Sequence, residues 1–361
     1  MRYTVREVGN ARQFKQFYQF QNQLYRDCET YVPSLDYDQR HTLAHSPCLD
    51  YCEQKLLLCF DEADHIAGRC CAIINPRYND LYGTKRMRFG WTDFIEDFEV
   101  AKTLLDAAAD WGRSRGMTEI HGPLGYNTMY RQGLVVEGFD SVPQPNNLYN
   151  FPYYPVFLER LGFEKEADWI QYKVDATQPL PERLDRLAEE RMQRYRLRLA
   201  DIAQLKRQKL LVARFFEEYN ASFAQVRNFI PFTEREIAEE GAAYIDRLSD
   251  DCCCIVLDAD GGIAAFAICF PSLSPTLQKA RGRLLPFCWW HLLRAQKNYN
   301  AVDMMLVGVS PKWKDKGLSA ILHSHLGHLW QEKGIRWAIT NPQYEDNPAL
   351  KVWDAYPEKQ R

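Results

Sequence analysis

The chain has 361 residues, a length typical of two domains of about 150 residues each. Hydrophobic residues make up 46% of it and charged residues 26%, the balance of a protein with globular cores. The net charge of −3 argues against a broad nucleic-acid interface, and no apolar run approaches the ~20 residues of a membrane-spanning helix. Because the N-terminus also lacks the apolar segment of a signal peptide, the sequence predicts a cytoplasmic protein.

Cysteine and histidine are the residue types that could hold a metal here. Eleven cysteines in a chain without a secretion signal predict free thiols, and residues 70–71 and 252–254 lie in apolar, strand-like runs. His323, His325 and His328 are close in sequence. On a helix, however, the first two of these histidines would point about 200° apart. We therefore expect no metal site.

The first half predicts a hairpin, then a strand, a helix and another strand. Residues 56–60 and 65–74 are the two arms of the hairpin, and residues 86–94 form the next strand. Residues 100–115 are predicted to be a helix because their apolar side chains recur at helical spacing, and residues 119–121 begin another strand. A strand, helix and strand of this length indicate a parallel pair with a right-handed crossover.

The first half is expected to end with a helix and a closing strand. Residues 150–163 form the helix and residues 168–174 the strand. An Arg- and Glu-rich segment, residues 177–194, then predicts a connecting helix. The next strand, residues 195–202, would open a second domain.

The second half repeats the order of elements in the first. Residues 263–265 match residues 66–68 at an offset of 197 (263 − 66), and Asn347 follows Asn150 at the same offset. Its elements are a hairpin, a strand, a helix and a strand, at residues 252–257 with 263–270, 303–309, 318–333 and 336–339.

The repeat predicts two domains of the α/β class with mixed (α+β) sheets. The first covers residues 1–176, the connecting helix residues 177–194 and the second domain residues 195–361. No counterpart of the first domain's closing strand follows in the second, so its last strand is expected to be missing.

A loop typical of phosphate binding follows the strand at 303–309. A loop that runs into a helix N-terminus directs several N–H groups at a phosphate, and the helix dipole favours negative charge. Gly317 allows close approach of the backbone, and two lysines add positive charge. The predicted binding residues are Val309, Lys314, Lys316, Gly317, Leu318, Ser319, Ala320 and Asn347.

This loop resembles the acyl-CoA loop of the GNAT superfamily, whose pattern is Q/R-x-x-G-x-G/A. Lys314 stands at the first position, Gly317 matches the first glycine, and Ser319 takes the second small position. Residues 345–349 resemble the asparagine-headed final helix of that superfamily. The resemblance implies two tandem GNAT folds, acyl-CoA as co-substrate and an amine as acceptor.

A narrower resemblance covers nearly the whole chain. Residues 271–277, 282–290 and 133–140, together with Gly122 and Pro123, are similar to a bacterial group of tandem GNAT proteins that includes bacterial ceramide synthases. Those enzymes move a fatty acyl group from CoA to a sphingoid amine, a reaction of lipid metabolism.

The equivalent segment of the first half is acidic. Glu96, Asp97 and Glu99 stand where phosphates would bind. They would satisfy their own helix terminus and repel a diphosphate. The first domain is therefore expected to lack a CoA site and to shape the acceptor site or serve as a structural partner.

Acyl transfer needs a base for the amine and a donor for the developing oxyanion. By family resemblance, the backbone N–H of Val309 is the oxyanion donor. Glu345 is the first candidate for the base, with Asp303 behind it.

The family's proton donor to the thiolate is a tyrosine six residues after the asparagine. Trp353 stands at that position and is not a useful donor. Tyr356 or Tyr344 would replace it, or water would.

The segment 284–293 is apolar and aromatic, and it is flanked by Arg281, Arg283, Arg294 and Lys297. It predicts a buried core helix, an acyl-chain channel or a peripheral membrane contact.

The sequence thus favours an acyl-CoA-dependent N-acyltransferase that acts on an amine, with fatty acyl transfer to a lipid amine as its specific form. Two alternatives stay open: a tandem GNAT transferase that uses aminoacyl-tRNA, and a non-catalytic protein that binds acyl-CoA.

Overall fold

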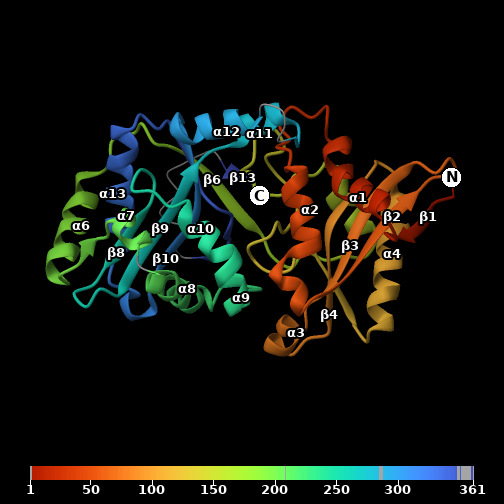
Figure 1. Cartoon of the computed structure of the whole chain (residues 1–361), viewed down its shortest axis with the longest axis horizontal. Helices are drawn as coiled ribbons and strands as arrows, with labels where there is room; N and C mark the ends of the chain where they lie inside the picture. Colours follow the sequence, from red (N-terminus) through yellow and green to blue (C-terminus); the bar gives the residue numbers. More distant parts are fainter. Residues whose placement is uncertain (1, 208, 284–287, 348–349, 351–358, 361) are drawn as a thin grey trace. The chain divides into compact units, whose positions relative to one another are not determined.

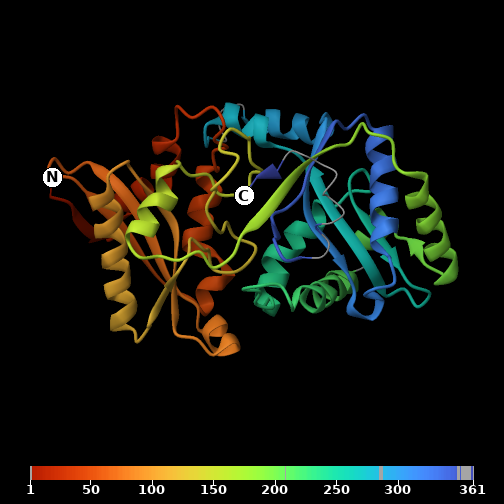
Figure 2. The same cartoon turned by 180° about the vertical axis from the view of Figure 1, so that it is seen from behind.

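The computed structural model describes residues 2–207, 209–283, 288–347, 350 and 359–360. These residues form two compact units of mixed α/β structure (Figures 1 and 2). The first unit contains Met1–Asp168, Leu273–Leu293 and Gln360–Arg361. The second contains Trp169–Ser272 and Arg294–Lys359.

The first unit is built on one sheet with the strand order β1-β2-β3-β4-β5. Adjacent strands in this sheet pair antiparallel, except for β4 and β5, which pair parallel. Its elements are β1 (Thr4–Glu7), α1 (Ala11–Leu24), α2 (Asp36–His45), a 3₁₀ turn (Pro47–Asp50), β2 (Glu53–Phe60), β3 (Ile66–Ile74), α3 (Pro76–Tyr82), β4 (Arg86–Phe94), α4 (Phe98–Ser114), β5 (Glu119–His121) and α5 (Tyr153–Arg160).

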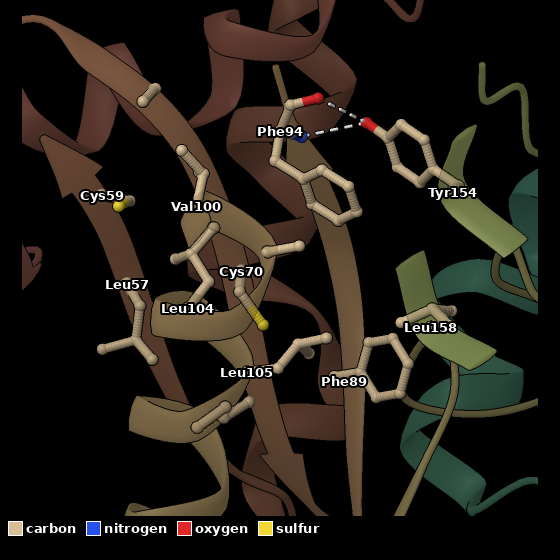
Figure 3. Packing of buried hydrophobic residues seen from close by; sticks show 14 of the residues in the cluster. Leu57, Cys59, Cys70, Phe89, Phe94, Val100, Leu104, Leu105, Tyr154 and Leu158 are labelled. Carbon is tan, nitrogen blue, oxygen red and sulfur yellow. Dashed lines mark hydrogen bonds between the residues drawn. The ribbon is translucent and has the colours of Figure 1, made fainter. Parts of the chain in front are cut away.

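Successive side chains of β2 point to opposite faces of the sheet, and their contacts show which helices cover each face. Leu57 and Cys59 pack in a core cluster with residues of α4 and α5, as Figure 3 shows. Leu58 and Phe60, which point the other way, pack in a second cluster with residues of α1 and α2. The sheet is therefore covered on both faces, and the second half of β2 and most of β3 are buried.

The second unit is built on a sheet with the order β12-β6-β11-β10-β9-β8-β7, and β13 also pairs with β6. Its elements are β6 (Trp169–Asp175), α6 (Glu182–Arg194), β7 (Arg198–Leu199), α7 (Ile202–Lys206), α8 (Lys209–Phe223), α9 (Glu234–Glu236), a π-helical turn (Ile237–Gly241), α10 (Ala242–Asp246), β8 (Cys254–Leu257), β9 (Ile263–Pro271), β10 (Ala301–Val309), a 3₁₀ turn (Pro311–Trp313), α13 (Ser319–Glu332), β11 (Trp337–Ile339), β12 (Gln343–Tyr344) and β13 (Lys359–Gln360). The segment after β9 carries α11 (Ser274–Ala280) and α12 (Cys288–Lys297).

Most of the predicted elements are present. Both hairpins form, and β10, α13 and β11 make the predicted crossover with β10 and β11 parallel. The connecting helix is α6. The predicted strand 195–202 is much shorter, because Arg196 takes a left-handed backbone (φ 52°) and α7 begins at Ile202.

The prediction that residues 168–174 close the first sheet is wrong. β6 lies in the sheet of the second unit, antiparallel to β11 and β12. Two hydrogen bonds of buried Thr340 hold β6 in this sheet. The Thr340 N–H donates to the Tyr172 carbonyl (2.9 Å), and the Thr340 Oγ1 accepts from the Tyr172 N–H (3.0 Å). The first unit accordingly ends at Asp168 and not at residue 176. The edge of β11 that the sequence left without a strand is occupied by β6.

A second segment also belongs to a different unit from the residues that precede it in sequence. Residues 273–293 belong to the first unit, where Ser274 donates to the Pro143 carbonyl (2.8 Å) and Gln278 to the Glu29 carbonyl (2.7 Å). The Asp36 N–H also donates to the Gly282 carbonyl (2.9 Å). Each unit therefore contains a segment from the other half of the sequence.

We expect Thr340→Val to lower the free energy of unfolding by about 1–3 kcal/mol, because it leaves the N–H of Tyr172 buried without its acceptor. Thr118→Val, at an exposed position, is the matched control and should change it by less than about 0.5 kcal/mol. Urea denaturation of both variants measures the difference. Equal stability of the two would contradict the described junction of β6 with the second sheet.

Candidate functional site

One edge of β10 is left open by its neighbours. β10 pairs with β9 as far as Val309, but with β11 only over residues 301–303. In the described part of the chain, no strand continues along that edge beyond Asp303. Strand β10 therefore offers the backbone groups of its second half to the space beside it.

The hydrogen-bond pattern shows which groups face this space. The N–H of Ser310 donates to the Ala264 carbonyl (3.0 Å). Because antiparallel pairs alternate, the N–H groups of Val309 and Val307 point away from β9, toward the open edge. The hydroxyl of Ser222, on α8, is 3.4 Å from the Val309 carbonyl. The N–H of Val309, the predicted oxyanion donor, thus faces the open edge, and so does the N–H of Val307, which the sequence did not indicate.

The loop after β10 leads directly into α13. The N–H groups of Ala320 and Ile321 donate to the carbonyls of Gly317 (3.2 Å) and Leu318 (3.0 Å). Among the described backbone contacts, the N–H groups of Gly317, Leu318 and Ser319 have no acceptor. These three groups, and not that of Ala320, are the donors that the helix N-terminus offers to an anion.

The lysines of the loop differ in their surroundings. The ammonium group of Lys316 lies 4.4 Å from the centre of the Trp313 ring and 5.7 Å from that of Tyr195, which hold it by cation–π attraction. Lys312 pairs with Asp258 (3.2 Å), and Lys314 is exposed. Lys316 is therefore the positioned cation of the loop, and Lys314 an adaptable one.

Arg191 of α6 is a third cation beside this loop, and the sequence gave no sign of it. Its Nε lies 3.3 Å from the point that a Cβ on Gly317 would occupy. That Nε is buried and has no hydrogen-bond partner among the described residues, while Nη1 pairs with Glu190 (3.0 Å). A buried donor without an acceptor costs free energy, which an anion bound at the loop would offset.

A buried carboxyl group lies at the other end of the open edge. Asp303 is only 3% exposed, and burial raises the pKa of its side chain to about 7, although a hydrogen bond with Ser272 lowers it. Its Oδ1 has no hydrogen-bond partner among the described residues. A carboxyl group with such a pKa is typical of a general base at neutral pH.

The other predicted residues of the site lie farther along the chain. Glu345 and Asn347 follow β12, and the Asn347 N–H donates to the Tyr344 carbonyl (2.9 Å). Tyr356 and Trp353 lie outside the described residues. Asp303, the second of the two candidate bases, is the one that is buried beside β10.

In the first unit the equivalent edge is closed. Phe94 pairs with Gly68 as Val309 pairs with Ala265, and the repeat matches Gly68 with Ala265. The N–H of Phe94 donates to the hydroxyl of Tyr154 (2.9 Å), as Figure 3 shows. The N–H at the position equivalent to Val309 thus has an acceptor on α5.

The acidic segment of the first unit also behaves as the sequence predicted at one position. Asp97 caps α4 by accepting from the Glu99 N–H (2.9 Å), and it accepts from the hydroxyl of Tyr3 (2.8 Å). In place of Asp303 this unit has Arg88, because Arg88 pairs with Ile73 as Asp303 pairs with Phe270. A guanidinium cannot act as a base at neutral pH.

The described residues contain no group of three or more His, Cys, Asp or Glu side chains arranged to hold a metal ion. None of their helices has the length and apolar character needed to span a bilayer.

Two curated proteins are similar to this chain, whereas no family model matches it. Protein YghO of Escherichia coli (strain K12) is 28% identical over 324 residues, which cover 88% of this chain and 81% of that protein. A bacterial ceramide synthase of Caulobacter vibrioides is 28% identical over 281 residues, 74% of this chain and 70% of that protein.

Solved structures show the fold. A tandem GNAT protein from the clavulanic acid biosynthesis pathway matches with a TM-score of 0.57 at 10% identity, over 99% of this chain and 96% of that one. A glucosamine N-acetyltransferase region of a fungal β-N-acetylglucosaminidase matches with a TM-score of 0.59 at 12% identity, over 99% of this chain and 37% of that one. The predicted tandem GNAT fold is confirmed.

We expect Gly317→Val to weaken CoA binding at least about tenfold, a loss of about 1.4 kcal/mol. Gly317 has φ +76°, which strains a β-branched residue, and the added side chain would occupy the approach to the loop. Gly334→Val is the matched control, because Gly334 (φ +67°) ends the same helix in open space. Calorimetric titration with CoA compares the two, and equal affinities would refute the loop as the phosphate site.

Arg191→Met should also weaken CoA binding by about tenfold, since a hydrogen bond to a charged group is worth about 1.5–3 kcal/mol. Arg194→Met, at an exposed position of the same helix, should leave the affinity unchanged. Parent-like affinity of the Arg191 variant would exclude a contact between this guanidinium and the diphosphate.

Proposed function

We propose that this chain, which has the tandem GNAT fold, is an acyl-CoA-dependent N-acyltransferase and that its second unit carries out the transfer. One observation carries the proposal: at one end of the open edge of β10 lies a loop whose N–H groups have no described acceptor, and at the other end lies the buried carboxyl group of Asp303. The first unit has neither feature, because Tyr154 occupies its edge and Arg88 replaces the carboxyl.

The open edge suits the pantetheine arm of CoA. The diphosphate would bind at Gly317, Leu318 and Ser319, with Lys316 and Arg191 neutralising its charge. The amide groups of the arm would then hydrogen-bond with β10 as an added strand does. This places the thioester along β10, on the way to Asp303.

The transfer itself needs few groups. Asp303 accepts a proton from the acceptor ammonium, whose ordinary pKa is about 10, and the free amine attacks the thioester carbon. The N–H of Val307 or Val309 stabilises the oxyanion. The C–S bond then breaks as the amide forms, and the thiolate, with a thiol pKa of about 8.5, leaves with little acid help. Tyr356 stays the proton donor suggested by the sequence, and Glu345 the alternative base.

For the acceptor we propose a lipid amine and for the acyl group a fatty acyl chain. The similarity to a protein named bacterial ceramide synthase, 28% identical over 74% of this chain, supports this class of substrate. A second support is the surface of α12, since a lipid acceptor has to be reached in a membrane.

The exposed face of α12 is both aromatic and basic. The side chains of Trp289, Trp290 and Leu293 are 46%, 52% and 52% exposed, so the expectation of a buried core helix is wrong for this part. Arg294 and Lys297 lie on the same side by helical spacing and are exposed. Residues 284–287 lie outside the described residues, so the predicted acyl channel has no support from them.

The sequence around α12 is strongly basic. Between residues 271 and 300 there is no Asp or Glu, although the whole chain has a net charge of −3. Aromatic side chains next to basic ones favour the interface of an anionic membrane. We therefore propose a peripheral membrane contact through this face.

We expect Asp303→Asn to lower the rate of acyl transfer by about 10²–10⁴, the usual contribution of a general base, with CoA affinity unchanged. Glu345→Gln is the decisive comparison, because it should keep the parent rate. Single-turnover assays with palmitoyl-CoA and sphinganine measure both. A loss of rate in the Glu345 variant alone would assign the base to Glu345.

The same substitution should change how stability depends on pH. The folded protein keeps the Asp303 proton up to a pKa of about 7, whereas the unfolded chain loses it near 3.8. The free energy of unfolding contributed by Asp303 therefore falls by about 1.4 kcal/mol per pH unit between these values. Asp303→Asn removes this fall, so the variant should gain stability relative to the parent as pH rises from 4 to 7. Exposed Asp260→Asn should show no such gain in urea titrations.

Replacing Trp289 and Trp290 together by Ala should weaken binding to phosphatidylglycerol vesicles at least about tenfold, because each aromatic ring loses its burial in the interface. Leu81→Ala, at a 56% exposed position of α3, is the control and should bind like the parent. Sedimentation at 0.05 and 0.5 M NaCl should show weaker binding at high salt. Parent-like binding of the double variant would refute α12 as the contact.

A further inference from the structure

The first unit contains a cavity of its own. Its volume is about 220 Å³, and its lining residues include members of α1, α2, β3, the second half of β4, the loops between β5 and α5, α5 and α11. All these residues belong to the first unit. The volume exceeds the roughly 150 Å³ of an engineered cavity that takes up benzene.

Arg69 and Asp93 form one ion pair in the cavity wall. Arg69 and Asp93 are almost fully buried, with Nη2 and Oδ2 2.7 Å apart. Arg69 also donates to the Phe17 carbonyl (2.8 Å), and Gln21 donates to Asp93 (3.2 Å). These two charges compensate each other and give the cavity no net charge.

Arg131 is a second cation in the wall and has no such partner. Its described hydrogen bonds run to the Gln21 side chain (3.4 Å) and the Pro145 carbonyl (2.5 Å), which use two of its five donors. No carboxylate lies within 4 Å of it among the described residues, and burial lowers the pKa of its guanidinium. The remaining lining carboxylate, Asp38, is exposed on α2. An anion inside the cavity would pair with Arg131.

The apolar wall contains a strained residue. Trp91 has a left-handed backbone (φ 43°), which is unusual for a bulky side chain and occurs at the bulge where β4 passes Cys70. Its indole N–H donates to Gln39 (2.8 Å) and so fixes the ring. Strain of this kind clusters at ligand sites. The other apolar lining residues include Met129, Leu134, Leu148 and Leu277.

We propose that this cavity is a binding site for a small carboxylate with a short apolar chain. The carboxylate pairs with the free donors of Arg131, and the chain lies against Trp91 and the aliphatic wall. The first unit, whose acyl-CoA edge is closed by Tyr154, thereby has a ligand of its own. The site does not depend on the acyl transfer proposed for the second unit.

Calorimetric titration of the full chain at pH 7 with octanoate, octanol and octylamine tests the proposal. The three probes share a chain length and differ in the charge of the head group. Octanoate should bind at least ten times more tightly than either of the others. Equal or tighter binding of octanol or octylamine overturns the assignment of a carboxylate.

Variants locate the binding. Arg131→Met should weaken octanoate binding at least tenfold, and exposed Arg12→Met should not change it. Thr42→Phe fills the cavity from α2 without altering a charge, so it should abolish binding even if Arg131→Met fails to fold. Gly317→Val should bind octanoate like the parent. Binding that survives Thr42→Phe, or is lost in Gly317→Val alone, places octanoate elsewhere and refutes the proposal.

Discussion

A β-strand has hydrogen-bonding groups along both edges. The two units differ at the edge that faces away from the preceding hairpin, on β10 in the second unit and on the equivalent strand β4 in the first. In the second unit, the groups of Val307 and Val309 face a space that no described strand fills. The N–H groups of such an edge have no acceptor within the sheet, and a ligand that hydrogen-bonds like a strand would supply one. In the first unit, the hydroxyl of Tyr154 meets the same need at Phe94 from within the chain. This contact is one of the differences between the two copies of the fold.

The two units also differ in the charge of the side chain at one equivalent strand position. Asp303 and Arg88 occupy equivalent places on β10 and β4, and both are buried. Arg88 finds acceptors in the carbonyls of Gly125 and Tyr126 (3.1 and 3.0 Å), so its charge is held in a structural role. Buried atoms without a described hydrogen-bond partner remain on both side chains, namely Oδ1 of Asp303 and Nε and Nη2 of Arg88. Of the two groups, the carboxyl can act as a base at neutral pH and the guanidinium cannot.

Local patterns were readable from the sequence, and long-range pairings were not. The hairpins and the crossover through α13 follow from periodicity within a few residues, and the loop at Gly317 follows from its glycine and lysines. β6 was misassigned because its partner β11 lies over 160 residues later (337 − 169) and any apolar strand suits either sheet. Arg191 was not predicted, because helical periodicity does not indicate which arginine of α6 contacts the loop at Gly317. Asp303 ranked behind Glu345 because burial, which sets its pKa, depends on the fold around it.

Because each unit contains a segment from the other half of the sequence, the units are constrained in the order in which they can fold during synthesis. During synthesis, the cavity wall in the first unit is incomplete until Leu277 has left the ribosome, more than a hundred residues after Asp168 (277 − 168). Strand β6, in turn, is made well before the sheet that receives it. Neither half can therefore reach its final structure while the other is absent, and a cut within residues 176–194 would separate β6 from its sheet. Folding of this duplicated chain is a joint event, although each half has its own core.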